Sequence, residues 1–122
     1  MRLWRPVGPQ ELALIEQSGW RRFPPRLPEQ PIFYPVLNFQ YAEQIARDWN
    51  STRADSEYAG FVVEFELADT VATRYPAQAA GAADLHRELW VPAEELDAFN
   101  DAIEGLVRVV ATYRRGARVE TE

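Results

Sequence analysis

Alternation of apolar and polar side chains marks several short runs of this chain as strands. In residues 60–67 the apolar side chains share one face and two glutamates share the other: Phe61, Val63, Phe65 and Leu67 against Glu64 and Glu66. Similar runs predict strands at 3–7, 32–37, 85–91 and 106–113. Pro35 lacks a backbone donor, so the strand at 32–37 should lie near an edge or a bulge.

Helical spacing of apolar residues predicts three short helices. The first begins at Pro9, a favoured first helical position, and should stop at Gly19. The second covers 39–49 after Asn38, a good N-cap, with a buried stripe of Tyr41, Ala42, Ile45, Ala46 and Trp49. The third should open at Pro92 and close at Gly105, with a core stripe of Leu96, Phe99 and Ile103.

The predicted order of elements is β-α-β-α-β-β-α-β, which indicates a single α+β domain over residues 1–114. Half-exposed alternation favours a mixed, mostly antiparallel twisted sheet over a buried parallel one. A proline-rich loop should occupy 20–31, and 68–84 is weakly patterned. Residues 115–122 are expected to form a frayed tail.

Composition restricts the partners and the kinds of site that we expect. The chain has 122 residues, which is the size of one domain, and a net charge of −6, which makes nucleic acid an improbable partner. It has no cysteine and one histidine, so we expect no disulfide and no metal site. No segment has the apolar length of a signal peptide or a membrane span, so the expected location is cytoplasmic with no membrane partner.

The strand at 85–91 carries the strongest candidate site. Period-two geometry places the mainly apolar set Leu85, Arg87, Leu89 and Val91 toward the core, and His86, Glu88 and Trp90 on the opposite face. A carboxylate beside an indole can hold a nucleotide-like ligand, because the ring stacks while the acid receives hydroxyls or stabilises positive charge. The alternative is an exposed strand face that merely carries polar groups, with His86 as a hydrogen-bonded structural residue.

The arginines and the aromatic residues around the proline-rich loop are further candidates for a functional site. Arg5 alternates with Leu3 and Val7 on an otherwise apolar strand face, so its charge needs a partner or a ligand. Arg21, Arg22 and Arg26 in the proline-rich loop either bind an anion or are simply solvated. The aromatic residues around that loop either pin it as a small core or line a pocket: Trp20, Phe23, Phe33 and Tyr34.

Three segments in order resemble the elements of ADP-ribosyltransferase-like domains. These are Leu3-Trp4-Arg5-Pro6-Val7, then Ile32-Phe33-Tyr34-Pro35-Val36-Leu37 with the helix that follows, then His86-Arg87-Glu88-Leu89-Trp90-Val91-Pro92. The chain also resembles, most strongly over 3–50 and 60–113, a family of small bacterial proteins carried under an ADP-ribosylation/crystallin-type label.

The resemblance implies a site for NAD or ADP-ribose. Arg5 would orient the phosphate or ribose, Tyr34 would border the nicotinamide, and Glu88 would be the catalytic acid, with Phe33, His86 and Trp90 completing the cofactor-binding set. NAD would be a substrate and no metal is expected. The Ser-Thr-Ser type of second motif is missing, because Pro35 follows Tyr34. A non-catalytic nucleotide-binding or protein-interaction module, of regulatory or immunity type, or a homodimer, therefore stays an alternative.

Overall fold

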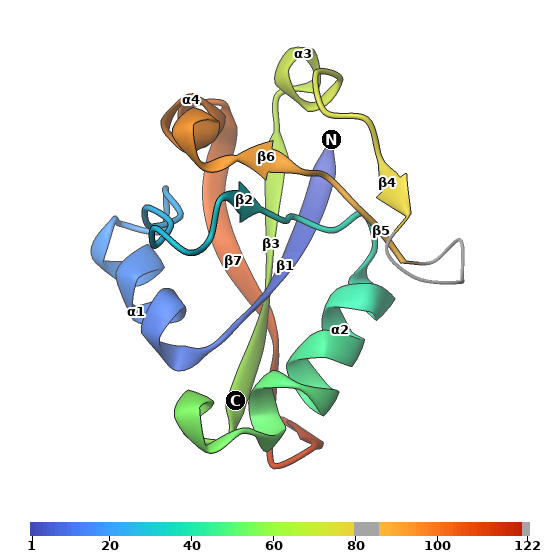
Figure 1. Cartoon of the computed structure of the whole chain (residues 1–122). Coiled ribbons are helices and arrows are strands. Elements are labelled where there is room, and N and C mark those ends of the chain that lie inside the picture. Colours follow the sequence, from blue (N-terminus) through green and yellow to red (C-terminus); the bar gives the residue numbers. More distant parts are fainter. Residues whose placement is uncertain (80–85, 121–122) are drawn as a thin grey trace.

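An antiparallel four-stranded sheet organises the molecule (Figure 1). The computed structural model describes residues 1–79 and 86–120. The strand order is β1-β3-β7-β8, with bounds Arg2–Val7, Ala59–Leu67, Ile103–Arg114 and Ala117–Val119. All pairings in this sheet are antiparallel, which confirms the predicted α+β class.

The remaining elements are short. The α-helices are α1 (Pro9–Gln17), α2 (Phe39–Asp48), α3 (Asp69–Ala72) and α4 (Leu96–Asp101). Single 3₁₀ turns cover η1 (Asn50–Thr52), η2 (Ala54–Ser56) and η3 (Ala93–Glu95). Outside the main sheet, β2 (Ile32–Phe33) pairs with β6 (Val91–Pro92), and β4 (Gln78–Ala79) pairs with β5 (Arg87–Glu88).

Each face of the sheet carries its own core, because successive side chains of a strand point to opposite faces. Leu3, Val63 and Phe65 point to the face covered by α1, β2, β6 and α4. Val62 points the other way and packs under α2. The sheet is therefore covered on both faces, and β1 forms one of its edges.

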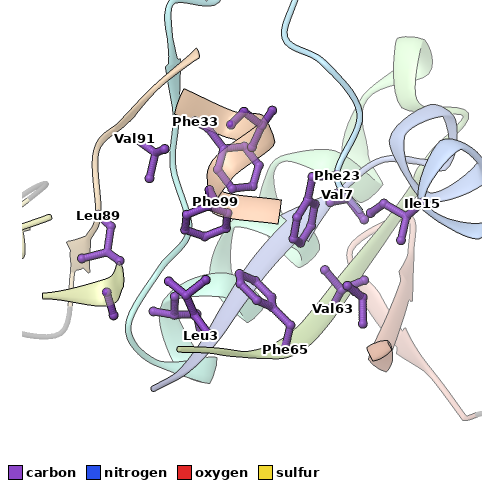
Figure 2. Packing of buried hydrophobic residues seen from close by; sticks show 14 residues of the cluster. Leu3, Val7, Ile15, Phe23, Phe33, Val63, Phe65, Leu89, Val91 and Phe99 are labelled. Atoms are coloured by element: carbon purple, nitrogen blue, oxygen red, sulfur yellow. The ribbon is translucent and has the colours of Figure 1, made fainter. Parts of the chain in front are cut away.

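Four phenylalanine rings form the centre of the larger core (Figure 2). Phe23 lies 5.0 Å from Phe33 and 4.9 Å from Phe65, and Phe99 lies 5.5 Å from Phe33, measured between ring centroids. These tilted and edge-to-face contacts are the favoured aromatic geometries. Phe23 and Phe33 thus pin the proline-rich loop and β2 onto the sheet, which confirms the small-core interpretation for these two residues.

Local signals in the sequence set the ends of α1 and α2. Asn38 caps α2, and its side chain accepts a hydrogen bond from the Tyr41 amide. At the end of α1 the amides of Gly19 and Trp20 donate to the carbonyls of Glu16 and Ile15, and Gly19 has φ of +78°. This is a Schellman stop, as Gly19 predicted.

Helix α2 packs unusually close to the sheet at Gly60. A Cβ atom on Gly60 would lie 2.2 Å from the carbonyl oxygen of Ala46, so only glycine permits this approach. Ala42 and Ala46 of α2 are fully buried, as predicted. Trp49 was expected in the same stripe but is 58% exposed, and it lies one position beyond Asp48, where α2 ends.

The predicted strand at 85–91 and the predicted helix at 92–105 are both shorter than expected. Within the described residues the strand is divided into β5 and β6, while Leu85 lies outside them. Pro92 pairs with Ile32 and also caps η3, a 3₁₀ turn that leads directly into α4, so the helical segment begins where predicted but ends at Asp101. Gly105 does not close the helix: it lies inside β7 with φ of +79°, at a bulge opposite Glu64 and Glu66.

The C-terminal segment forms a hairpin where a frayed tail was expected. Thr112 of β7 pairs with Val119 of β8. The turn residues Arg115 and Gly116 both have positive φ, at 48° and 82°, which suits a tight two-residue hairpin turn. The amide of Gly116 also donates to the Ser51 hydroxyl, so the hairpin is tied to η1.

Candidate functional site

A cleft of about 410 Å³ opens at the outer edge of β1, between the end of α2 and the segment around β2. Four of the residues predicted for the site line it: Arg5, Tyr34, Glu88 and Trp90. Side chains not predicted for the site complete the lining: Pro6, Val36, Ile45, Trp49 and Asn50. Segments from three distant parts of the chain therefore meet in one concave surface.

Backbone pairing fixes Glu88 relative to the first strand. Val36 forms an isolated antiparallel bridge with Trp4, and a second bridge with Glu88. The Trp4 amide donates to the Val36 carbonyl at 3.0 Å, and the Val36 amide returns the bond at 2.8 Å. The Leu89 amide donates to the Pro35 carbonyl at 2.9 Å. Val36 thus acts as a spacer that holds Glu88 beside the edge of β1.

The Glu88 carboxylate is half-buried and held by two neutral donors. Trp90 Nε1 donates to Oε1 at 2.9 Å, and the Tyr41 hydroxyl donates to Oε2 at 3.4 Å. Burial, with the nearby Glu88 charge and this hydrogen bond, raises the pKa of Tyr41. Tyr41 therefore stays a protonated donor, and neither donor neutralises the carboxylate.

The Arg5 guanidinium is buried and paired, as its position on an apolar face requires. Nε and one terminal nitrogen donate to the two carboxylate oxygens of Glu11 at 2.6 and 2.9 Å. The other terminal nitrogen donates to the Tyr34 carbonyl at 3.3 Å. The guanidinium carbon lies 4.6 Å from the centroid of the Phe33 ring. Arg5 therefore supports the wall of the cleft, and Glu11 offsets its charge.

Aromatic rings form the sides of the cleft. Tyr34 and Trp90 meet edge to face, with centroids 6.4 Å apart and planes at 89°. Trp49 contributes from the end of α2 and stacks under the Arg53 guanidinium, whose carbon lies 4.4 Å from the ring. All three rings remain substantially exposed, at 38%, 47% and 58% for Tyr34, Trp90 and Trp49. Exposed aromatic faces beside a carboxylate suit a flat ring with a polar substituent.

Two of the predicted site residues do not line the cleft. Phe33 is only 1% exposed and belongs to the aromatic core, where it carries the Arg5 guanidinium on its face. His86 stacks on Tyr41 with centroids 4.7 Å apart, and its Nε2 lies 3.0 Å from Gln44 Oε1. Because Tyr41 bonds Glu88, His86 is linked to the site through Tyr41.

Sequence reasoning missed the contribution of α2 to the site. Trp49 was assigned to the buried stripe, and Asn50 to a polar loop, although a tryptophan followed by asparagine at a helix end is a detectable signal. Asn50 Oδ1 is buried and has no hydrogen-bond partner among the described residues. Such unsatisfied buried atoms are rare in folded proteins.

Within residues 1–79 and 86–120, no group of three or more acidic or histidine side chains is placed to hold a metal ion. In the same ranges, no helix combines the length and apolarity needed to cross a bilayer. No family model, curated protein or solved structure matches this chain.

Proposed function

We propose that this domain binds NAD or ADP-ribose in the cleft at the β1 edge and cleaves the bond between nicotinamide and ribose. One observation carries the proposal: Arg5, Tyr34, Glu88 and Trp90, which come from three separate segments of the sequence, line the same cleft. The order of these residues also underlies the resemblance to ADP-ribosyltransferase-like domains.

The aromatic walls supply the binding energy for a flat ring. Trp90 and Tyr34 present partly exposed rings at right angles, so a nicotinamide or adenine ring can stack on one while the other contacts its edge. Stacking a base on an aromatic side chain contributes about 1–3 kcal/mol. The cleft volume of about 410 Å³ is at the small end of the roughly 300–1,000 Å³ typical of ligand pockets. It therefore accepts one nucleoside half of NAD, with the rest of the dinucleotide outside.

Glu88 supplies the negative charge for the chemical step. When the C1′–N bond breaks, its electron pair goes to the nicotinamide nitrogen, which loses its positive charge, and the ribose gains oxocarbenium character. A carboxylate already fixed by Trp90 and Tyr41 stabilises that charge without reorganising. Carboxylates stabilise the same type of transition state in glycosidases.

Water completes the reaction. Its oxygen attacks C1′, its proton passes to Glu88 and then to solvent, and the products are nicotinamide, ADP-ribose and one proton. A hydroxyl or amine of an acceptor molecule in place of water would make the same step a transfer of ADP-ribose.

Nicotinamide release by the purified chain, together with calorimetric titration of NAD and ADP-ribose, tests the proposal. We expect slow release by the wild type and loss of release in Glu88→Gln, because the amide cannot offset oxocarbenium charge. Glu94→Gln is the matched control, since Glu94 is an exposed carboxylate outside the cleft. Equal thermal stability of the two variants would show that the loss is chemical. Release that survives Glu88→Gln would refute the proposed role of Glu88.

A specific observation also favours a non-catalytic nucleotide-binding module. Both oxygens of Glu88 accept hydrogen bonds from the protein, and the Arg5 guanidinium is bonded to Glu11, so these two charged groups of the cleft already have partners without a ligand. This candidate predicts binding of ADP-ribose with no release of nicotinamide from NAD. The same titration and release measurements separate the two functions.

A further inference from the structure

A second cleft, of about 320 Å³, lies beside the first one. It is formed by the start of α1, the proline-rich loop and the η1–η2 segment, and its lining includes Gly8, Gln10, Glu11, Arg26 and Asn50. Asn50 lines both clefts, and the bonded pair Arg5–Glu11 has one member in each. The two clefts are therefore neighbours separated by one ion pair.

Arg26 enters this second cleft, where the charge of Glu11, already bonded to Arg5, offsets its own charge only in part. Its Nε donates to the Ile32 carbonyl at 3.2 Å, and its guanidinium carbon lies 5.9 Å from the Phe33 ring centroid. Within the described part of the chain, no carboxylate oxygen lies within ion-pair distance of Arg26. Arg22 in the same loop differs, because it pairs with Asp101 at 2.7 Å.

The surroundings of Arg26 add positive potential. Burial, and then the charge of Arg5, lowers the pKa of the Arg26 guanidinium. Arg5 and Arg26 approach the same Phe33 ring, and only Arg5 has its own carboxylate, so the set formed with Glu11 carries one net positive charge. The N-terminus of α1 opens on the same cleft at Gly8 and Gln10, and its amides and dipole also favour an anion.

We propose that the Arg26 cleft is a phosphate subsite that holds the pyrophosphate of the ligand whose nucleoside half occupies the first cleft. This inference rests on the proposed function for the identity of the ligand. A planar guanidinium fork matches phosphate oxygens in a bidentate way. The adjoining position explains how a cleft that accepts one nucleoside half serves a dinucleotide, because the charged linker continues past Asn50 toward Arg26.

Calorimetric titration of the full chain with five probes tests the subsite: nicotinamide riboside, NAD, ADP-ribose, inorganic pyrophosphate and succinate. We expect Arg26→Gln to weaken NAD, ADP-ribose and pyrophosphate by about ten- to a hundredfold, the loss of hydrogen bonds to a charged group. Nicotinamide riboside, which has no phosphate, should bind the variant as it binds the wild type. Arg26→Lys keeps the positive charge without the planar guanidinium, so its affinity for the phosphate-bearing probes should lie between those of the wild type and Arg26→Gln.

Arg21→Gln is the control, since Arg21 lies in the same loop, is exposed and lines neither cleft. An equal loss of nicotinamide riboside binding in Arg26→Gln would overturn the subsite, because Arg26 would then act on the fold. Full NAD affinity in Arg26→Gln would overturn the subsite and leave the proposed function standing. Pyrophosphate binding that depends on Arg26, without any NAD binding, would support the subsite and refute the proposed function. Succinate binding as tight as pyrophosphate would refute the assignment to phosphate.

Discussion

The indole Nε1 of Trp90 donates a 2.9 Å hydrogen bond to Oε1 of Glu88, and both side chains lie on the partly exposed face of the same short segment. A residue two positions away on a strand lies on the same face, so the bond is a local consequence of the alternation. It orients the carboxylate and the ring together, and the ring is free to stack on its outer side.

Truncation of Trp90 tests the stacking wall. We expect Trp90→Ala to weaken ADP-ribose binding about tenfold or more, because one stacked aromatic face contributes about 1–3 kcal/mol. Trp90→Phe keeps a ring and should retain most of the affinity. Stability should change little, since the indole is 47% exposed. Leu106→Ala, at another exposed apolar side chain far from the cleft, is the control, and an equal loss of affinity there would contradict the prediction.

Arg5 should matter for stability even without a ligand. Arg5→Met leaves the half-buried Glu11 carboxylate without its partner, and we expect a loss of about 3 kcal/mol in the free energy of unfolding. Removal of both charges in Arg5→Met/Glu11→Leu should recover part of that loss. Arg2→Met is the surface control, because solvent screens the exposed Arg2–Glu66 pair and its contribution to stability should be small. Urea denaturation measures the stability of all three variants. Equal losses for Arg5→Met and Arg2→Met would contradict a larger contribution of the buried Arg5–Glu11 pair.

Tyr113 should make the fold sensitive to alkali. Burial, then the hydrogen bond to the Glu43 carboxylate, raises the pKa of Tyr113 to about 12. An unfolded tyrosine titrates near pH 10, so between about pH 10 and 12 the unfolded chain has lost a proton that the folded chain still holds. The stabilisation is therefore complete below pH 10 and is lost as the pH rises toward 12.

Comparison with Tyr113→Phe isolates this effect, because Tyr75, whose pKa is also raised to about 12, is present in both proteins. The stability advantage of the wild type over Tyr113→Phe should shrink between about pH 10 and 12. Urea denaturation at a series of pH values measures it, and a constant difference across that window would contradict the prediction.

Gly60 should be intolerant of any side chain. The Cβ of Gly60→Ala would lie 2.2 Å from the Ala46 carbonyl oxygen and 2.9 Å from the Asn50 Cβ, so α2 must shift away from the sheet. We expect destabilisation by about 2 kcal/mol or more, and weaker ligand binding, since Trp49 and Asn50 follow this helix. Gly8→Ser is the control for stability, because the nearest atom to its Cβ is 3.5 Å away and serine is a good N-cap. Unchanged stability of Gly60→Ala would mean that the helix is not held so closely.

Local patterns in the sequence determined the strands β1 and β3, the cap of α2 at Asn38 and the stop of α1 at Gly19. They also placed Glu88 and Trp90 on one face. Each of these features depends on neighbours within a few residues, through side-chain period or backbone conformation, and such signals survive in a single sequence.

The tertiary structure alone decided what those residues meet. The bridges Trp4–Val36–Glu88 bring the carboxylate to the β1 edge, and no local pattern encodes the pairing of segments so far apart. Tertiary packing likewise buried Phe33 and left Trp49 exposed. The turn from β1 into α1 brought Glu11 to Arg5, six positions earlier in the chain. Glu88, first seen only as a carboxylate on one strand, became part of a candidate site because distant backbone segments pair around it.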